Sequence, residues 1–210
     1  VLSKAGLATR YAFPGQLVGP YWRVTGIDPN VEVERILASN PQVNSLNQTP
    51  SVTQLTDDND DGVINEYDTP DLVFVAGTRN RLAPSTTALV AISGDDGHEL
   101  WSRTDIRLSH FASLATGDID NDGVAEIIAV RNYRQELIAF ENTGAIKWRT
   151  ALNGPGVIIP LVLPPPYVFD QPIIVNLEGD NEAEIVLGRE AFRGLTGEQL
   201  WEGEFDAGGS

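Results

Sequence analysis

Three segments of the chain repeat the same order of features, and this repetition restricts the fold more than any other property of the sequence. In each segment an acidic loop leads into an apolar run: LTDDNDDGVINEYDTPDLVFVA from Leu55, LATGDIDNDGVAEIIAV from Leu114 and IVNLEGDNEAEIVLG from Ile174. Successive segments begin about 60 residues apart, and such self-similarity is typical of folds in which stacked units share a core.

A second motif follows each acidic loop and strengthens the repeat. TTALVAISGDDGHELWSR, QELIAFENTGAIKWRT and EAFRGLTGEQLWEGE each contain an apolar run, a polar turn with glycine, and a tryptophan. The tryptophan lies four positions after the glycine in all three: Gly97 and Trp101, Gly144 and Trp148, Gly197 and Trp201. We expect these tryptophans to pack between units or near an outer rim; a platform for stacking glycans is the alternative, and it needs exposed rings.

The middle unit predicts four short strands joined by turns. They are expected at 112–116, 126–131, 136–140 and 145–150, and Asn142-Thr143-Gly144 supplies a hairpin turn. No stretch shows a sustained helical period. The chain is therefore predicted to be all-β, with about three four-stranded repeats that form blades of a β-propeller.

The predicted organisation has five parts. They are an N-terminal segment or divergent partial blade (1–49), blade 1 (50–105), blade 2 (106–152), a proline-rich interblade loop (153–171) and blade 3 (172–210). Three blades alone would leave sheet faces uncovered, and propellers usually have four to eight. We therefore expect a larger propeller, completed by the same chain or by another.

The acidic loop of the middle unit has the spacing of a cation cage. Asp118, Asp120 and Asp122 occupy positions 1, 3 and 5, Gly123 allows a sharp turn, and the strand opens with Glu126. Alternate side chains can converge on an ion while the Val124 carbonyl adds an oxygen, and calcium prefers six to eight oxygen ligands. The alternative is that Asp, Asn and Gly simply make good turns.

The other two loops follow the same pattern with differences. The first offers Asp57, Asn59, Asp61 and Val63, and its closing ligand is left open between Asn65, Asp68 and Asp71. The third offers Asn176, Glu178, Asp180 and Glu184, with Asn181 in place of the glycine. Three such loops in phase favour calcium sites over plain turns. Magnesium rarely uses all-protein cages, and zinc prefers His or Cys, which these loops lack.

Charge points to the same class of ligand. Thirty acidic residues face fourteen basic ones, which gives a formal net charge of −16. This charge argues against nucleic acid as a partner, because phosphate backbones bind clusters of Lys and Arg. No apolar run reaches the roughly 18 residues of a membrane span, so no membrane insertion is expected. Bound cations would relieve the repulsion between so many carboxylates.

The loops resemble those of a known family of repeats. GDIDNDGVAEIIAV and TDDNDDGVINEYDTPDLVFVA are similar to FG-GAP or VCBS-type repeats, which are calcium-binding propeller blades like those of integrin α-subunit heads. The TG-x-x-x-W pattern also resembles bacterial propellers with quinoprotein-like blades. The resemblance covers residues 50–204 and implies calcium ligands at the positions named above in the first and middle loops. The third loop departs from the pattern at Asn176, Glu178 and Asn181.

The search for catalytic groups finds none to predict. The chain has no cysteine, and neither His98, in a turn, nor His110, in a connection between blades, has the spacing of a nucleophilic site. Paired carboxylates of the kind that glycosidases use are already accounted for by the loops. We therefore expect no catalytic residues and no organic cofactor.

Three functional hypotheses follow. The first is a non-catalytic, calcium-stabilised module for adhesion or for binding a protein or glycan. The second is a structural subunit of a cell-surface assembly or filament, and the third is part of a secreted polysaccharide lyase-like enzyme. Calcium sites of extracellular modules are weak, with dissociation constants of about 10⁻⁴ to 10⁻³ M, so they would stay largely empty in the cytosol. An extracellular or cell-surface location is expected.

Overall fold

The computed structural model describes seven stretches of the chain. They are residues 45–46, 49–77, 87–109, 112–131, 135–152, 171–180 and 182–203. Most of the predicted N-terminal segment (1–49) and nearly all of the proline-rich loop (153–171) therefore lie outside the described residues, as do His110 and Asn181.

Blade 1 is an antiparallel sheet in which β3 lies next to the edge. Its strands are β1 (Ser45–Leu46), β2 (Ser51–Thr53), β3 (Asp71–Gly77), β4 (Thr87–Ile92) and β5 (Glu99–Arg103). β2 pairs with the start of β3 and β1 with its end, so these two short strands share one edge, and β4 and β5 follow on the other side.

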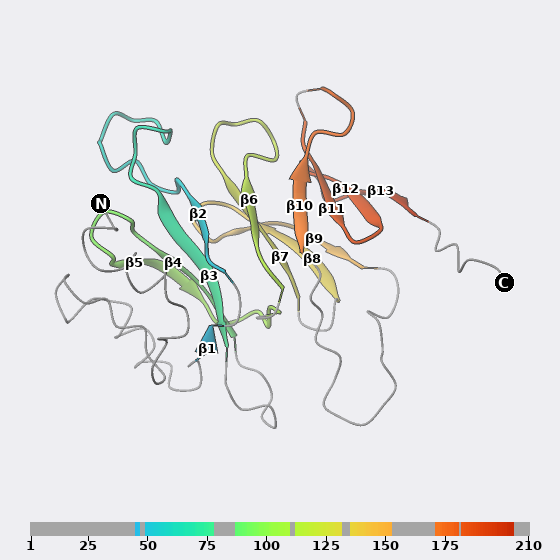
Figure 1. Cartoon of the computed structure of the whole chain (residues 1–210), viewed down its shortest axis with the longest axis horizontal. Helices are drawn as coiled ribbons and strands as arrows, with labels where there is room; N and C mark the ends of the chain where they lie inside the picture. Colours follow the sequence, from blue (N-terminus) through green and yellow to red (C-terminus); the bar gives the residue numbers. More distant parts are fainter. Residues whose placement is uncertain are drawn as a thin grey trace.

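Blades 2 and 3 are four-stranded antiparallel sheets with strands in sequence order. Blade 2 contains β6 (Ala115–Gly117), β7 (Glu126–Val130), β8 (Glu136–Phe140) and β9 (Ile146–Ala151), and blade 3 contains β10 (Pro172–Val175), β11 (Glu184–Leu187), β12 (Glu190–Arg193) and β13 (Gln199–Glu202). Figure 1 shows the three sheets side by side, in chain order. The predicted all-β fold with three four-stranded repeats is confirmed. Among the described residues no helix is long and apolar enough to cross a membrane.

The strands of blade 2 are apolar on both faces because both faces are covered. Side chains alternate across a strand, so the residues of β7 and β8 divide into two sets. Ile127 and Phe140 lie in a core shared with Val73 and Leu89 of blade 1. The alternate residues, including Ile128, lie in a second core shared with blade 3. Stacking of the sheets therefore builds the hydrophobic core, as the repeat predicts.

Tryptophan makes the same joint between blades twice. The Trp101 Nε1–H donates to the carbonyl of Asn142 in blade 2, and the Trp148 Nε1–H donates to the carbonyl of Gly194 in blade 3, each at 2.7 Å. Two residues further along the strand a second donor reaches the same hairpin: Arg103 Nη1 donates to the Gly144 carbonyl at 2.7 Å and Thr150 Oγ1 to the Gly197 carbonyl at 2.6 Å.

The hairpin glycines are required by both backbone and packing. Gly144 and Gly197 have φ angles of 77° and 70°, which side chains rarely adopt. A Cβ on Gly144 would lie 2.8 Å from the ring of Trp101, and one on Gly197 would lie 2.5 Å from the ring of Trp148. The prediction that tryptophans pack between blades is confirmed for Trp101 and Trp148.

Trp201 occupies the equivalent position in blade 3 but is 46% exposed. The three tryptophans lie opposite Ala91, Ala139 and Ala191 respectively, and each pairing is followed by a β-bulge. In the same register row Ile173 is 58% exposed. Nothing in the described part of the chain covers this row as a following blade covers the other two.

Candidate cation site in the acidic loops

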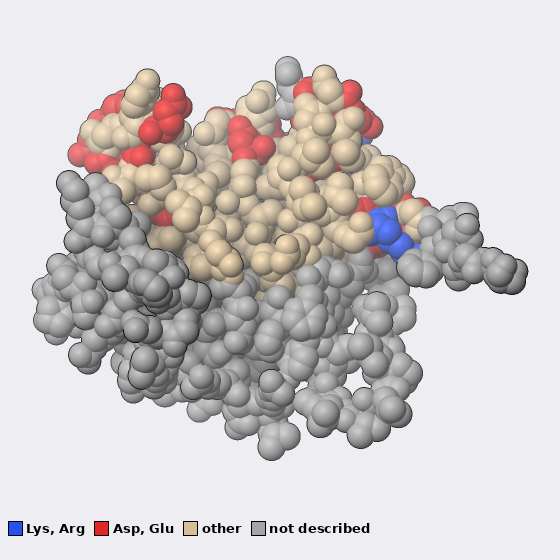
Figure 2. Space-filling model, viewed as in Figure 1, with Lys and Arg blue, Asp and Glu red and all other residues tan. Residues whose placement is uncertain are grey.

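The three acidic loops occupy equivalent places in the fold. Each connects two strands of its blade that pair with each other and are consecutive in the sequence: β2 to β3, β6 to β7, and β10 to β11. Figure 1 shows them projecting from one edge of the molecule, and Figure 2 shows Asp and Glu concentrated on these projections. In the following, loop 1 is residues 57–68, loop 2 is 118–126 and loop 3 is 176–184.

Asp118 organises the backbone of loop 2. Its Oδ1 accepts hydrogen bonds from the N–H groups of Asn121 (2.6 Å) and Asp122 (3.2 Å), and its Oδ2 accepts from the N–H of Gly123 (2.9 Å). Asn121 and Gly123 have φ angles of 62° and 91°, in the region that Asn and Gly tolerate best. Asn121 and Gly123 therefore occupy the two positions at which this wrapped turn has a positive φ.

Glu126 closes loop 2 from the first position of β7. It is 1% exposed, and its Oε2 accepts a hydrogen bond from the Ile119 N–H at 2.9 Å. One carboxylate oxygen each from Asp118, Asp120 and Glu126 lie within 4.8 Å of one another. The structure thus brings together three of the five residues predicted for the middle site. Asp122 instead accepts from the Val124 N–H at 2.8 Å.

Two buried carboxylate oxygens in loop 2 could act as ligands of a cation. Asp120 Oδ1 and Glu126 Oε1 are buried and have no hydrogen-bond partner among the described residues. Burial raises the pKa of Glu126 to about 7, and the negative charges of Asp120 and Asp122 act in the same direction. The Ile119 N–H and the charge of Lys147 oppose this shift. Oxygens without donors in a negative, partly desolvated cluster are the ligands that a hard divalent cation prefers.

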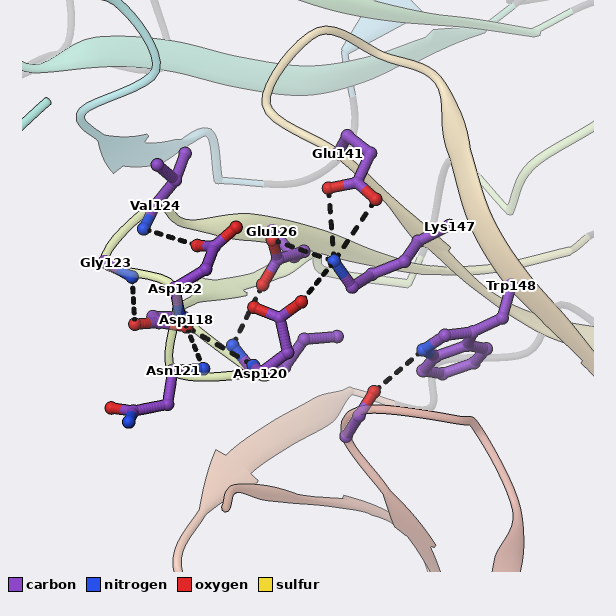
Figure 3. A network of polar contacts seen from close by, with 12 residues as sticks. Asp118, Asp120, Asn121, Asp122, Gly123, Val124, Glu126, Glu141, Lys147 and Trp148 are labelled. Atoms are coloured by element: carbon purple, nitrogen blue, oxygen red, sulfur yellow. Dashed lines mark hydrogen bonds and ion pairs between the residues drawn. The ribbon is translucent and has the colours of Figure 1, made fainter. Parts of the chain in front are cut away.

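Lys147 belongs to this cluster although the sequence analysis did not identify it. Its Nζ lies 2.6 Å from Asp120 Oδ2, 3.2 Å from Glu141 Oε1 and 3.5 Å from Glu126 Oε1 (Figure 3). Burial lowers the pKa of Lys147, but hydrogen bonds to Asp120 and Glu141 and the charge of Glu126 more than offset this and raise it. Lys147 is therefore a fixed positive charge at the site.

A β-bulge explains why Lys147 faces the loop. Ala139 pairs with Trp148 and Phe140 pairs with Ile146, so Lys147 is the extra residue on β9. A bulge changes the direction of its side chain relative to simple alternation. The signal in the sequence is a difference between repeats, because Leu100 and Leu200 precede the tryptophan in the other two blades.

Loop 1 has the same backbone hydrogen bonds as loop 2, and the structure shows which acidic residue lies at the end of the loop, where Glu126 lies in loop 2. Asp57 accepts from the N–H groups of Asp61 (3.1 Å) and Gly62 (2.8 Å), as Asp118 does in loop 2. Asp68, which is 4% exposed, accepts from the Asp58 N–H at 3.0 Å. That bond matches the bond from Ile119 to Glu126, so Asp68 takes the closing position.

The other two candidates for closing loop 1 accept hydrogen bonds from other residues of the chain. Asp71 is fully buried and accepts from the Leu55 N–H (2.9 Å), the Thr56 hydroxyl (3.0 Å) and the Gly94 N–H (3.0 Å). Asn65 Oδ1 accepts from the Tyr67 N–H at 2.8 Å. Of the remaining predicted ligands, Asn59 Oδ1 accepts from Asp61 N–H at 2.8 Å, Asp61 Oδ1 accepts from Val63 N–H at 2.9 Å, and Val63 is exposed.

Loop 3 keeps the closing acid but loses the first carboxylate. Glu184 is 1% exposed, accepts from the Leu177 N–H at 2.7 Å, and has an Oε1 without a hydrogen-bond partner among the described residues. Asn176 Oδ1 accepts from the Gly179 N–H at 2.5 Å, while its Nδ2 donates to the Asp180 carbonyl. Glu178 and Asp180 are exposed. Within the described residues, only loop 2 brings three acidic side chains into one group.

One solved structure with a similar fold supports the observed architecture. The crystal structure of the V. cholerae biofilm matrix protein Bap1 is similar, with 23% identity and a TM-score of 0.51 over 78% of this chain and 32% of that one. Rhamnogalacturonan lyases YesW and YesX align at 13% and 15% identity, each with a TM-score of 0.47, over 77% of this chain and 32% and 31% of theirs. The chain thus spans about a third of these proteins, and no curated protein matches it.

A family model identifies the repeats. The model described as outer membrane protein assembly factor BamB, a β-propeller-type repeat, matches residues 85–209. That match includes β4 and β5 of blade 1 and all of blades 2 and 3. Because it covers more than half of the 210 residues, the chain belongs to this family of propeller repeats.

Proposed function

We propose that this chain is a calcium-stabilised β-propeller module that acts outside the cytoplasm in adhesion or in binding a protein or glycan, without catalysing a reaction. The observation that carries the proposal is the group formed by Asp118, Asp120 and Glu126, in which Asp120 Oδ1 and Glu126 Oε1 are buried and accept no hydrogen bond from the described residues. The FG-GAP or VCBS-type resemblance of the loops supports calcium as the ion. Loops 1 and 3 are proposed as further sites.

Calcium would stabilise the module in two ways: by neutralising carboxylate charge and by fixing the loop that connects two strands. Asp118, Asp120 and Glu126 would hold the ion in loop 2, with Asp122 and the Val124 carbonyl as further oxygen donors. The bound ion would supply positive charge where the chain places several carboxylates close together. Because the loop joins β6 to β7, this would hold the first two strands of the blade in register. At ten times the dissociation constant, one site adds about 1.4 kcal/mol to the free energy of unfolding.

Thermal unfolding tests this proposal. We expect calcium to raise the midpoint by a few degrees relative to chelator, and magnesium at the same concentration to raise it less. Asp120→Asn should remove part of the calcium effect. The matched control is Asp95→Asn, which also removes one negative charge but lies at an exposed position in the hairpin of blade 1. This variant should keep the full calcium effect. A midpoint that does not respond to calcium would show that the proposal is wrong.

The binding role has a separate test. The likeness to a structure titled as a biofilm matrix protein is consistent with adhesion, and a glycan array with a calcium-free control would measure it. A lyase assay on pectic polymers, read by the absorbance of unsaturated products, distinguishes binding from the enzyme hypothesis. Binding without product formation supports the non-catalytic binding module, and product formation supports the lyase hypothesis.

A structural subunit is the second candidate, and one observation favours it. Ile173 and Trp201, the two ends of this row in blade 3, are exposed, whereas the apolar residues of the equivalent rows in blades 1 and 2 lie in cores shared with the following blade. Further blades, from the same or another chain, are the proposed partners at this face. Native mass spectrometry and light scattering of the protein at rising concentration would detect assembly through it.

A further inference from the structure

We propose that Lys147 is a built-in cation that tunes loop 2: its ammonium group substitutes for part of the calcium charge, so loop 2 binds calcium more weakly than its carboxylates alone would. This inference rests on the proposed calcium sites and names a residue that regulates one of them. It is carried by the position of Lys147 among the carboxylates and by the difference between blade 2 and the other two blades.

Lys147 contacts some carboxylate oxygens of the site and leaves others without a hydrogen bond. Its Nζ bonds Asp120 Oδ2 at 2.6 Å, and it lies 3.5 Å from Glu126 Oε1. Asp120 Oδ1, the other oxygen of the same carboxylate, keeps no hydrogen-bond donor among the described residues. Asp120 can therefore contact the ammonium group through one oxygen and an ion through the other. Both cations would then share one carboxylate, and their repulsion at this short range opposes binding of the second.

Burial makes this repulsion effective. The Lys147 side chain is only 14% exposed, and so is that of Asp120. Water screens charges poorly in such a setting, in contrast to an exposed surface pair. Glu141 lies on the far side of the ammonium group, with its two oxygens at 3.2 and 3.3 Å from Nζ, and holds it in place. The positive charge is therefore anchored at the site.

The other two blades provide an internal comparison. The bulge residue equivalent to Lys147 is Leu100 in blade 1 and Leu200 in blade 3, because each lies between the two pairings that flank the bulge. Leu100 packs against the core between blades 1 and 2. Lys147→Leu thus gives blade 2 the residue that its neighbours carry, at a position where the fold accepts leucine.

Two glycine amides report on individual loops. The Gly123 N–H donates to Asp118 in loop 2, and the Gly62 N–H donates to Asp57 in loop 1, at 2.9 and 2.8 Å. Two-dimensional ¹⁵N NMR of the chain, titrated with calcium chloride, gives a separate midpoint for each amide. We expect Lys147→Leu to lower the calcium midpoint at Gly123 about tenfold or more and to leave the midpoint at Gly62 unchanged.

Control variants make the test decisive. Arg149→Leu removes a positive charge from the same strand, where Arg149 pairs with Glu136 at 2.8 Å, and should not shift the Gly123 midpoint. If Lys147→Leu does not fold, Lys147→Gln carries the same expectation. An unchanged or weaker affinity at Gly123 in a folded Lys147 variant overturns this inference, while calcium binding by the unaltered chain leaves the proposed function intact. Absence of calcium shifts in both proteins overturns both proposals.

Discussion

At the scale of single residues, Asp68 and Asp71 illustrate how two buried carboxylates close together in the sequence take different roles. Asp68 accepts the Asp58 N–H, which is the bond that closing acids make in all three loops. Asp71 ties the chain before loop 1 to the β4–β5 hairpin through Leu55 and Gly94. Asp71 is therefore a structural residue, and its environment predicts an unusual titration.

The ionisation of Asp71 is the first residue-scale prediction. Burial raises the pKa of Asp71 above its ordinary value of 3.8, although three hydrogen-bond donors oppose the shift. Its contribution to stability is therefore fully present below pH 3.8 and is lost as the pH rises through the folded-state pKa. Carboxyl ¹³C NMR should give a midpoint above 3.8 for Asp71. Asp105, whose pKa is lowered by hydrogen bonds from Arg103, should titrate below 3.8 in the same experiment. A midpoint for Asp71 at or below 3.8 would contradict the prediction.

At the scale of elements, the joint between neighbouring blades depends on a tryptophan and a hairpin glycine. The indole donates to a hairpin carbonyl, and the ring lies where any Cβ on the glycine would be. Blade 2 takes part in both joints. Its Gly144 packs against Trp101 of blade 1, and its Trp148 donates a hydrogen bond to blade 3. The strength of one joint can be measured by adding a single methyl group.

Gly197→Ala is the element-scale prediction. The new Cβ would strain a φ angle of 70° and would lie 2.5 Å from the Trp148 ring, so the blade 2–blade 3 joint must shift. Gly188→Ala is the matched control, because Gly188 has a φ of 63° but nothing within 4 Å of its Cβ position. We expect Gly197→Ala to lower the free energy of unfolding by about 1–3 kcal/mol more than Gly188→Ala. Chemical denaturation measures both, and equal losses would show that the joint does not limit stability.

The repeat made most elements predictable, and two local features limited the site. The last three strands of blade 2 lie within one residue of their predicted positions, because their apolar runs and the turn at 142–144 carry strong signals, whereas β6 begins three residues later than predicted. The closing role of Asp68 was not resolved, since an insertion in loop 1 breaks the spacing on which the alignment depends. Lys147 was missed because a bulge, invisible to simple alternation, directs it toward the loop.

At the scale of the whole molecule, negative charge is unevenly distributed. The net charge is −16, and the three loops that carry much of it lie along one edge (Figure 2). Self-repulsion of this kind destabilises a compact state and is reduced by dissolved salt as well as by bound ions. Dissolved salt and bound calcium should therefore partly substitute for each other in stabilising the folded chain.

Salt dependence is the whole-molecule prediction. In chelator, raising sodium chloride from about 0.01 to 0.1 M shortens the screening length from about 30 to 10 Å, so the unfolding midpoint should rise. In saturating calcium the same change in salt should raise the midpoint less, because bound ions have already reduced the repulsion. Differential scanning calorimetry at the four conditions provides the measurement. An equal or larger salt effect in calcium would rule out neutralisation by bound ions.

The exposed indole of Trp201 gives the row of three blades a direction, because its two ends offer different hydrogen-bonding groups. Each observed joint pairs a donor on one blade with a carbonyl on the next, and Trp201 presents a donor whose acceptor is not among the described residues. Two such faces meeting head to head would place two donors together and satisfy neither. A further blade that repeated the observed contacts at this face would add head-to-tail, with a hairpin carbonyl as the acceptor for the Trp201 indole. The same geometry disfavours symmetric self-association through this end.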